Sequence, residues 1–257
     1  MVNKWIPVFT YHSIDDSGSV ISTSPTKFRE QMNHLKQSGF HAIALEEITR
    51  CICQNQPFPS GAVAITFDDG FKNVHEVAYP VLKEFGFQAT VFLVPGYCGR
   101  NNQWNKPGEK IPTLELLDWD EILEMANSGI DFGAHTMTHP HLSRVSLEHA
   151  IKEISDSKAI IQTNLGKEVG FFAYPYGQQT QAIQDFVRDE FNGACSTQLN
   201  RVNLQSEVHS LPRIEMYYFS ENNLFTLFGT HLFSCYVQLR RMLRSLGTWS
   251  KGDKQWQ

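Results

Sequence analysis

The sequence has few cysteines, no long apolar run and no surplus of positive charge, and each absence excludes a class of protein. Its five cysteines are an odd number without a CxxC pair, which argues against a disulfide framework and a thiolate zinc site, so we expect reduced thiols. No segment reaches the roughly 18 consecutive apolar residues of a transmembrane helix. The formal net charge of -5 gives no broad basic surface, so no nucleic-acid partner is expected.

The N-terminus also has none of the features of a secretion signal. Residues Met1 to Pro7 carry one positive charge, but no apolar run of signal-peptide length and no small-residue cleavage site follow. We therefore expect a cytoplasmic protein, although a chain whose signal had been removed would look the same. The sequence as a whole does not determine the oligomeric state.

What the sequence does contain is the composition of one globular domain, with 41% hydrophobic and 19% charged residues in a chain of 257. Short β-rich runs alternate with helical patterns, which predicts a mainly parallel sheet covered by helices. Strands are expected at Ile6 to Tyr11, His41 to Ala44, Ala62 to Phe67, Ala89 to Val94, Ile130 to Ala134 and Gly170 to Ala173. Helices are expected from the N-cap Ser24 to Gly39 and at Phe71 to Phe85, Asp118 to Ser128, Ser146 to Leu165 and Thr180 to Phe191. About seven β/α steps favour a barrel-like α/β domain over an open sheet.

Polar groups gather where three of these strands end. The apolar run Ala62 to Phe67 is followed by Asp68 and Asp69, a second strand is followed by His135 and His139, and a third is followed by Tyr174 to Gly177. Carboxyl ends of parallel strands are where α/β folds place their sites. Two imidazoles and one carboxylate leave open positions on a divalent metal, as a catalytic site requires and a structural site does not. An HxxxH spacing alone is weak support, but beside an Asp-Asp-Gly it predicts a metal centre.

The two adjacent aspartates indicate a division of labour. Neighbouring carboxylates after an apolar run repel each other unless a cation or a proton offsets the repulsion. In an extended chain their side chains point to opposite sides, so they cannot chelate one ion together without a turn. We therefore expect one of them to hold the metal while the other accepts a proton.

These segments resemble the NodB-homology polysaccharide deacetylases of carbohydrate esterase family 4. The resemblance covers Pro7 to Met216 and implies a distorted (β/α)7 barrel of the α/β class. It implies Asp68 as general base and Asp69, His135 and His139 as metal ligands, with zinc expected and nickel or cobalt open. The implied reaction is metal-dependent hydrolysis of the N-acetyl group of an N-acetylated carbohydrate.

Several family motifs are missing, which points to one branch of the family. Ala173 stands where the third motif usually has an arginine, and neither a DxxxW nor a C-terminal LxH motif is present. The chain is similar instead to the exopolysaccharide, poly-N-acetylglucosamine type deacetylases, whose motif order is rearranged. That similarity implies His12 as general acid. It also suggests Arg213 as the partner of Asp68 and the Tyr176 amide as an oxyanion donor.

Each of these three roles has a plainer alternative. His12 could be a first-strand histidine satisfied by backbone, and His231 competes with it as the acid, although His231 lies in an apolar stretch where packing is expected. Arg213 could be a surface arginine at a strand end. Tyr176 could simply be a packed aromatic side chain.

Two other segments carry separate hypotheses. The long loop Gly96 to Pro112 is either a substrate-facing lip or a solvated loop. We expect a deacetylase domain over residues 1–220 and an amphipathic helical extension over residues 221–257. In that extension, Leu224 to Leu246 mixes apolar residues with arginines, a pattern that either lies on an anionic membrane or packs against the barrel.

Two rival functions remain open at the level of the sequence. A glycoside hydrolase needs two carboxyl groups about 5 Å or more apart across a bond, which adjacent Asp68 and Asp69 suit poorly. A non-catalytic sugar-binding descendant is compatible with the missing motifs. The presence of both aspartates and both histidines argues against it.

Overall fold

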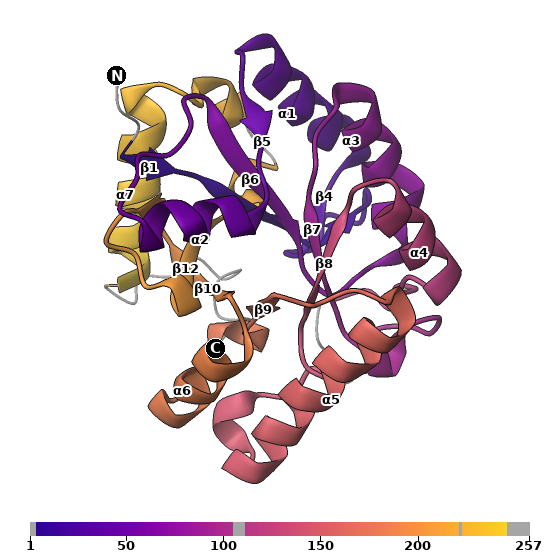
Figure 1. The fold of residues 1–257 in the computed structure, drawn as a ribbon. Coiled ribbons are helices and arrows are strands. Elements are labelled where there is room, and N and C mark those ends of the chain that lie inside the picture. The colour runs from indigo at the N-terminus through magenta and orange to yellow at the C-terminus, as the bar shows by residue number, and fades with distance from the viewer. Residues whose placement is uncertain (1–3, 105–110, 221–222, 246–257) are drawn as a thin grey trace.

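The computed structural model describes residues 4–104, 111–220 and 223–245. Within them, seven parallel strands form a closed ring (Figure 1). In ring order these are β2 (Val8–Tyr11), β6 (Ala62–Phe67), β7 (Thr90–Leu93), β8 (Asp131–Ala134), β9 (Phe171–Ala173), β10 (Gly193–Leu199) and β12 (Leu211–Glu215). Parallel pairing of β12 with β2 and of β2 with β6 completes the ring. The expected distorted (β/α)7 barrel is confirmed.

The register of the first two strands sets up the site. Thr10 lies opposite Thr66 and Tyr11 opposite Phe67, and the two threonine hydroxyl oxygens are 3.1 Å apart. Because the strands are parallel and in this register, the next residue of each, His12 and Asp68, leaves the barrel at the same end. The pairing thus brings together two residues that are far apart in the chain.

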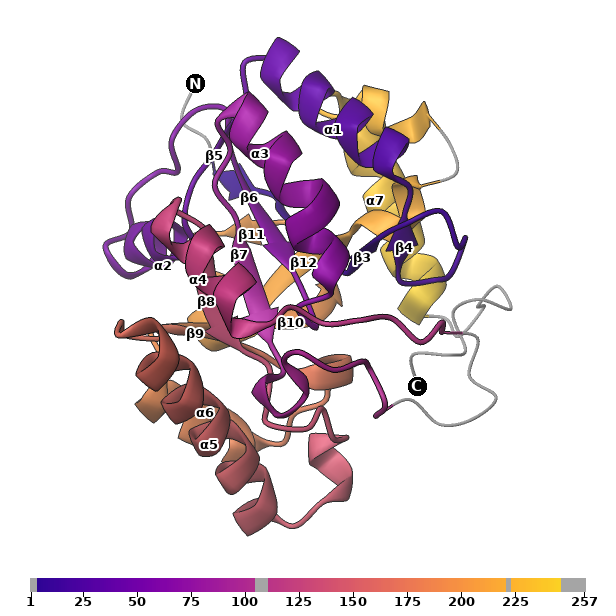
Figure 2. The ribbon, with the colours of Figure 1, turned by 90° about the vertical axis from the view of Figure 1, so that its right-hand side faces the viewer.

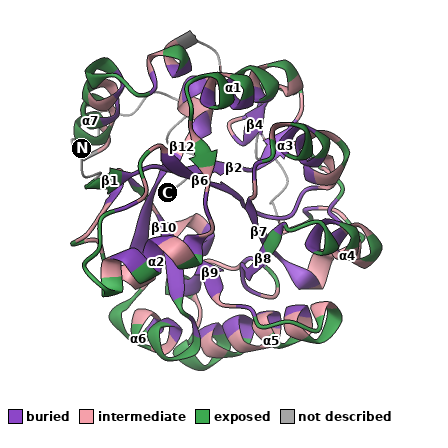
Figure 3. Ribbon diagram, turned by 45° about the horizontal axis from the view of Figure 1, so that its top comes forward, coloured by how far each residue is buried: buried purple, intermediate pink, exposed green. Residues whose placement is uncertain are grey.

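Helices enclose the barrel, with their exposed residues on the outside (Figures 2 and 3). They are α1 (Pro25–Gln37), α3 (Tyr79–Phe85), α4 (Trp119–Asn127), α5 (Leu147–Leu165), α6 (Gln181–Glu190) and α7 (His231–Ser245). The Ser24 hydroxyl caps α1 by accepting a hydrogen bond from the Lys27 amide. Asp118 and Glu121 form a reciprocal capping box at the start of α4.

Two hydrophobic cores hold this arrangement. The larger lies between the barrel wall and the outer helices. The smaller includes residues from six barrel strands, namely Val8, Ala64, Phe92, Ala173, Cys195 and Leu211. It continues into α2 (Leu45–Cys53), whose Leu45, Ile48 and Cys51 belong to the same cluster. This cluster places apolar side chains of six barrel strands against α2, and the site residues follow the carboxyl ends of the strands.

Shorter elements complete the chain. Two further sheets pair β1 (Trp5–Ile6) with β11 (Val202–Asn203), antiparallel, and β3 (Ser13–Ile14) with β4 (Ser22–Thr23), parallel. β5 (His41–Ala42) pairs with β6 outside the ring. One π-helical turn is η1 (Val74–Ala78). The 3-10 turns are η2 (Pro95–Tyr97), η3 (Leu142–Arg144), η4 (Pro175–Gly177), η5 (Val208–Ser210), η6 (Met216–Phe219) and η7 (Asn223–Leu227).

Most expected elements are present, but several boundaries were wrong. The run Ile6 to Tyr11 is two strands, because Pro7 has no amide hydrogen for a continuous ladder. The expected helix from Phe71 begins only at Val74, since Phe71 forms a β-bridge with Leu116. The strand from His41 ends at Ala42. Helix α2 and strands β10 and β12 were not expected as elements.

The C-terminal extension is not one continuous helix. Its described part consists of η7 and α7, separated around Gly229, whose φ of +87° ends the first turn. Phe225, Phe228 and Phe233 join the same core as Phe9 of β2, so this segment packs on the barrel. Among the described helices, none is both long enough and apolar enough to cross a bilayer. The five cysteines form no disulfide.

Candidate metal centre and active site

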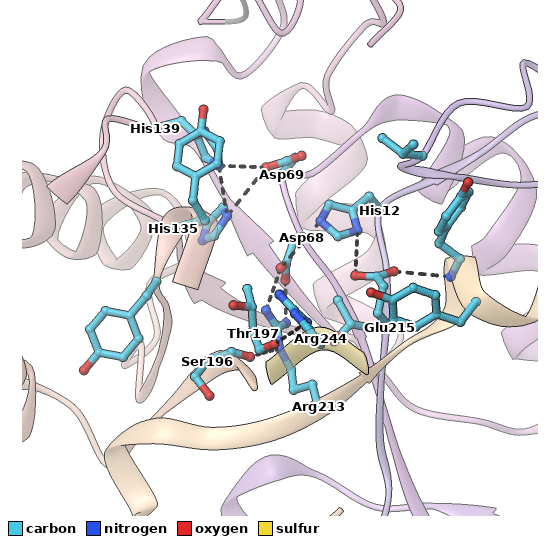
Figure 4. A pocket seen from close by; sticks show the side chains of 16 residues that line it. His12, Asp68, Asp69, His135, His139, Ser196, Thr197, Arg213, Glu215 and Arg244 are labelled. Atoms are coloured by element: carbon cyan, nitrogen blue, oxygen red, sulfur yellow. Dashed lines mark hydrogen bonds and ion pairs between the residues drawn. The ribbon is translucent and has the colours of Figure 1, made fainter. Parts of the chain in front are cut away.

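A tight turn after β6 separates the two aspartate side chains. Asp69 has a φ of +70° and Gly70 one of +74°, and the Gly70 amide donates to the Asp68 carbonyl at 2.9 Å. The positive φ of Gly70 favours glycine there, and a Cβ would also lie 2.8 Å from the Leu93 side chain. The expected division therefore has a geometric basis, because Asp68 and Asp69 face different partners (Figure 4).

The histidine loop after β8 is held from behind by α5. Both carboxylate oxygens of Glu153 accept hydrogen bonds at 2.7 Å from Thr138, one from its amide and one from its hydroxyl. The Met137 amide donates to the Glu153 carbonyl at 3.0 Å. Glu153 is 6% exposed, so this clamp is buried. It fixes the positive-φ backbone of His139, a conformation that costs a non-glycine residue about 1 kcal/mol or more.

Asp69, His135 and His139 converge on one point. The Asp69 Oδ1 atom is 3.6 Å from His135 Nε2 and 3.3 Å from His139 Nε2, and the two Nε2 atoms are 3.2 Å apart. A tetrahedral ion with bonds of about 2.1 Å would space its ligand atoms about 3.4 Å apart. Asp69 Oδ1 is buried without a hydrogen-bond partner. The three residues therefore fit a divalent metal in both spacing and donor chemistry.

The Nδ1 atom of each histidine has its own partner, and this contact fixes which imidazole nitrogen faces the possible metal position. The Nδ1 atom of His135 is 2.7 Å from the Ala173 carbonyl, and the Nδ1 atom of His139 is 3.1 Å from the Tyr176 hydroxyl. If each Nδ1 donates its hydrogen outward, each Nε2 keeps a lone pair for the metal. Burial lowers the pKa of both histidines, which favours the neutral, ligating form. Burial and the neighbouring Asp68 raise the pKa of Asp69 when no cation is bound.

The Asp68 carboxylate points away from Asp69, His135 and His139, the metal-ligand triad. It is hydrogen-bonded by Arg213 of β12. The two guanidinium Nη atoms each donate a hydrogen bond of 2.7 Å to one carboxylate oxygen. Arg213 Nε donates to the Ser196 carbonyl at 3.0 Å, which fixes the fork. Burial alone would raise the pKa of Asp68, but Arg213 holds it well below its usual range. Arg213 is 3% exposed, so the alternative of a surface arginine was wrong.

His12 lies between two carboxylates. Its Nε2 is 3.9 Å from Asp68 Oδ2, and its Nδ1 is 3.9 Å from Glu215 Oε2 (Figure 4). Burial lowers the pKa of His12 to about 4, against the attraction of Asp68. Burial, and to a smaller extent Asp68, raise the pKa of Glu215 to about 7. His12 therefore faces the Asp68 carboxylate on one side and, on the other, the Glu215 carboxyl group, whose pKa is raised by burial.

Aromatic side chains border the triad. The Tyr176 ring lies 4.6 Å from that of His139 and stacks on His141 at 3.9 Å. Trp104, at the described edge of the long loop, lies 5.0 Å from His139. The Tyr176 ring is thus packed against histidine rings, as its plainer alternative expected. The described edge of the long loop faces the site, and residues 105–110 of that loop lie outside the described part. The oxyanion role of the Tyr176 amide stays a prediction.

One pocket contains all seven predicted site residues, namely His12, Asp68, Asp69, His135, His139, Tyr176 and Arg213. His231 is not among the residues that line it and is exposed at the start of α7, so the expectation that it packs in an apolar stretch was wrong.

Sequence reasoning missed Trp104, Glu153, Glu215 and Arg244. Glu215 had a usable signal, because it is two residues from Arg213 on one strand and so shares its face. Arg244 reaches the pocket from α7, donating to the Thr197 carbonyl at 3.0 Å.

Comparisons with known proteins point to one family. The sequence pattern of the family described as polysaccharide deacetylase matches residues 55–190. The poly-beta-1,6-N-acetyl-D-glucosamine N-deacetylase of Staphylococcus aureus (strain MRSA252) is 30% identical over 165 residues, covering 61% of this chain and 54% of that protein. YxkH of Bacillus subtilis (strain 168) is 28% identical over 176 residues, covering 68% of this chain and 58% of that protein. The chain thus spans little more than half the length of these relatives.

Solved structures share the fold over most of the chain. The Streptococcus pyogenes deacetylase PplD, solved with acetate, superposes with a TM-score of 0.72 at 25% identity, covering 82% of this chain and 92% of that one. IcaB from Ammonifex degensii superposes with a TM-score of 0.71 at 23% identity, covering 84% and 95%. At 23% identity, the similarity to IcaB supports the fold alone.

Proposed function

The chain belongs to the polysaccharide deacetylase family, and from that premise we propose that it hydrolyses the N-acetyl group of an N-acetylated carbohydrate and releases acetate. The observation that carries the proposal is the convergence of Asp69, His135 and His139 beside an Asp68 that Arg213 keeps ionised. A ligand set and a separate base in one pocket are what metal-assisted hydrolysis of an amide needs.

Asp69, His135 and His139 would hold the metal. When bound, a divalent ion lowers the pKa of a water molecule and polarises a carbonyl group. Zinc is our proposal for the ion, because two imidazoles and one carboxylate suit it, while nickel and cobalt accept the same donors. The raised pKa of Asp69 fits this assignment, since a nearby cation would stabilise its ionised form.

Asp68 is the general base of the proposed reaction. Its carboxylate accepts a proton from the attacking water as the water oxygen bonds to the acetyl carbon. The two hydrogen bonds from Arg213 aim the carboxylate and keep it free of protons at neutral pH. The amide of Tyr176 is our proposed donor to the oxyanion that forms on the acetyl oxygen.

His12 completes the cycle as general acid. The C–N bond breaks as the amino-sugar nitrogen gains a proton, and the acetyl group leaves as acetate with the oxygen of the water. Because burial favours neutral His12, its acidic proton is supplied during turnover. Asp68, 3.9 Å away, receives that proton from the water and passes it on. Glu215 faces the opposite nitrogen and orients the ring.

The proposed substrate class, N-acetylated carbohydrates, includes more than one polymer. The Staphylococcus aureus relative is named for poly-β-1,6-N-acetyl-D-glucosamine, which makes that polymer the first substrate to test. Chitin oligomers, peptidoglycan and a lipid-linked N-acetylated sugar remain in the proposed class. The cytoplasmic location expected from the sequence likewise stays a prediction.

Acetate release tests the function against its rivals. The purified chain, loaded with zinc, is expected to release acetate from at least one member of that panel, and EDTA is expected to stop it. Formation of new reducing ends without acetate would instead indicate a glycoside hydrolase. One bound metal per chain without acetate from any member would indicate a sugar-binding descendant.

A further inference from the structure

The turn after β9 holds a tyrosine in a strained conformation beside the metal ligands. In η4, Tyr176 has a φ of +57°, in the left-handed region that favours glycine. The turn is fixed by its neighbours, because the Tyr174 amide donates to the Cys195 carbonyl at 3.1 Å and the Gly177 amide donates to the Tyr174 carbonyl at 2.9 Å. Strain that the surrounding structure maintains is typical of functional sites. Here it directs the Tyr176 side chain toward the histidine loop that follows β8.

The Tyr176 side chain contacts two histidines of that loop. Its ring stacks on the His141 ring, with centroids 3.9 Å apart and planes 16° apart. It meets the His139 ring edge-on, with centroids 4.6 Å apart and planes 66° apart. Its hydroxyl oxygen is 3.1 Å from His139 Nδ1, which is hydrogen-bond distance. A phenylalanine would serve the two ring contacts equally well, whereas the third contact needs the hydroxyl group.

The place of His139 in the triad decides which way this hydrogen bond runs. Its Nε2 atom is 3.3 Å from Asp69 Oδ1 and 3.2 Å from His135 Nε2, so this nitrogen faces the possible metal position. A neutral imidazole carries one hydrogen, and a nitrogen that ligates a metal must keep its lone pair. In the ligating form the hydrogen therefore lies on Nδ1, and the Tyr176 oxygen accepts it.

The other histidine ligand has an outer partner of a different kind. His135 Nδ1 is 2.7 Å from the Ala173 carbonyl oxygen, which can only accept a hydrogen bond. Strand β9 and the turn after it thus supply the outer partner of both imidazoles, one from the backbone and one from a side chain. The contact of Tyr176 is the one that a side-chain substitution can remove.

We propose that the Tyr176 side chain is a positioning residue of the metal centre. Its hydroxyl oxygen accepts the Nδ1 hydrogen of His139 and so turns Nε2 toward Asp69 and His135. The stack on His141 fixes the tyrosine ring in the orientation that this contact needs. A second consequence rests on the proposed function. Because the amide of Tyr176 is the proposed oxyanion donor, one residue would tie the position of the metal to the position of the oxyanion.

The zinc affinity of the full chain tests the proposal without any sugar present. Tyr176→Phe keeps the ring contacts and the backbone amide and removes only the hydroxyl group. Its Kd for zinc, measured by calorimetric titration, should rise about tenfold or more, the usual result of losing the outer partner of a ligating histidine. Tyr174→Phe is the matched control, since it removes a hydroxyl in the same segment that donates to the His209 carbonyl at 3.0 Å instead of to a metal ligand. This control should bind zinc like the wild type.

Three results would overturn the proposal. The first is an unchanged zinc Kd in Tyr176→Phe, and the second is an equal rise of the Kd in Tyr174→Phe, which would assign the effect to loosening of the whole segment. The third comes from urea unfolding in EDTA, where the two variants should have similar midpoints. A much lower midpoint for Tyr176→Phe would make the role of the hydroxyl structural.

The zinc titration and the acetate assay fail separately. With zinc at saturation, Tyr176→Phe retains the Tyr176 amide and should still release acetate if the proposed function is right. Absence of acetate from every substrate, in the wild type as well, would refute the proposed function and leave the zinc result standing. Acetate release by a Tyr176→Phe variant with an unchanged zinc Kd would refute the positioning role alone.

Discussion

Arg213 and Asp68 meet in the barrel through two hydrogen bonds of 2.7 Å, although 145 positions separate them in the chain. The pair is buried, with side-chain exposures of 2% and 4%. Such a fork fixes a carboxylate in direction and in ionisation state at once. Because the same carboxylate is the proposed base, a change at Arg213 should alter turnover through Asp68.

Replacing Arg213 by lysine should impair the base without removing the positive charge. Lysine cannot form the two-pronged contact, so the pKa of Asp68 should rise from its depressed position. A base works only when deprotonated, so the acidic limb of the rate profile should move to higher pH. We expect turnover to fall about tenfold or more at neutral pH. Acetate release measured across pH checks this, and an unshifted profile would contradict it.

Asp68 and Asp69 should respond differently to substitution. Asp68→Asn keeps an acceptor for Arg213 and leaves the ligand triad intact, so it should bind metal like the wild type while turnover falls about 100-fold or more. Asp69→Asn should weaken metal binding, because an anionic ligand becomes neutral. Calorimetric titration with zinc, run beside the acetate assay, separates the two effects. Full turnover in Asp68→Asn would show that the base lies elsewhere.

The identity of the acid can be decided between two histidines. His12 faces Asp68 in the pocket, whereas His231 is exposed at the start of α7. His12→Gln should reduce acetate release about 100-fold, within the usual range for a lost general acid. His231→Gln should leave it unchanged. The reverse result, with only the His231 variant inactive, would refute the assignment.

Glu215 should make the metal-free protein less stable as pH rises. Its pKa is about 7 in the folded chain against an ordinary 4.5, so the folded state binds more protons between these values. Its contribution is present below about pH 4.5 and is lost as pH rises through 7. Relative to Glu215→Gln, the wild type should lose roughly 1 to 3 kcal/mol of unfolding free energy from pH 4 to pH 8. Urea unfolding of both proteins in EDTA measures this, and a pH-independent difference would contradict it.

The parts of the site that the sequence predicted are those with local signals. Asp68 and Asp69 follow an apolar run, and His135 and His139 follow another strand, so the carboxyl ends of a parallel sheet bring them together. Arg213 was proposed from a resemblance, and its contact with Asp68 is present.

The remaining parts depend on packing that no local pattern encodes. Strand β10 contains small and polar residues that lack a strand signature, so its position in the ring was not expected. The clamp by Glu153 depends on how α5 is placed against the histidine loop. Arg244 enters the pocket only because the chain breaks at Gly229 and returns along the barrel as α7.

The central claim is that one divalent ion, held by Asp69, His135 and His139, makes the proposed hydrolysis possible. It is tested by adding zinc stepwise to the metal-free chain while acetate release from N-acetylglucosamine oligomers and from the β-1,6-linked polymer is recorded. Activity should rise to a plateau at one equivalent of zinc per chain and should be missing in His135→Ala and His139→Ala. Acetate release that persists in EDTA, or that survives loss of both histidines, would contradict the account.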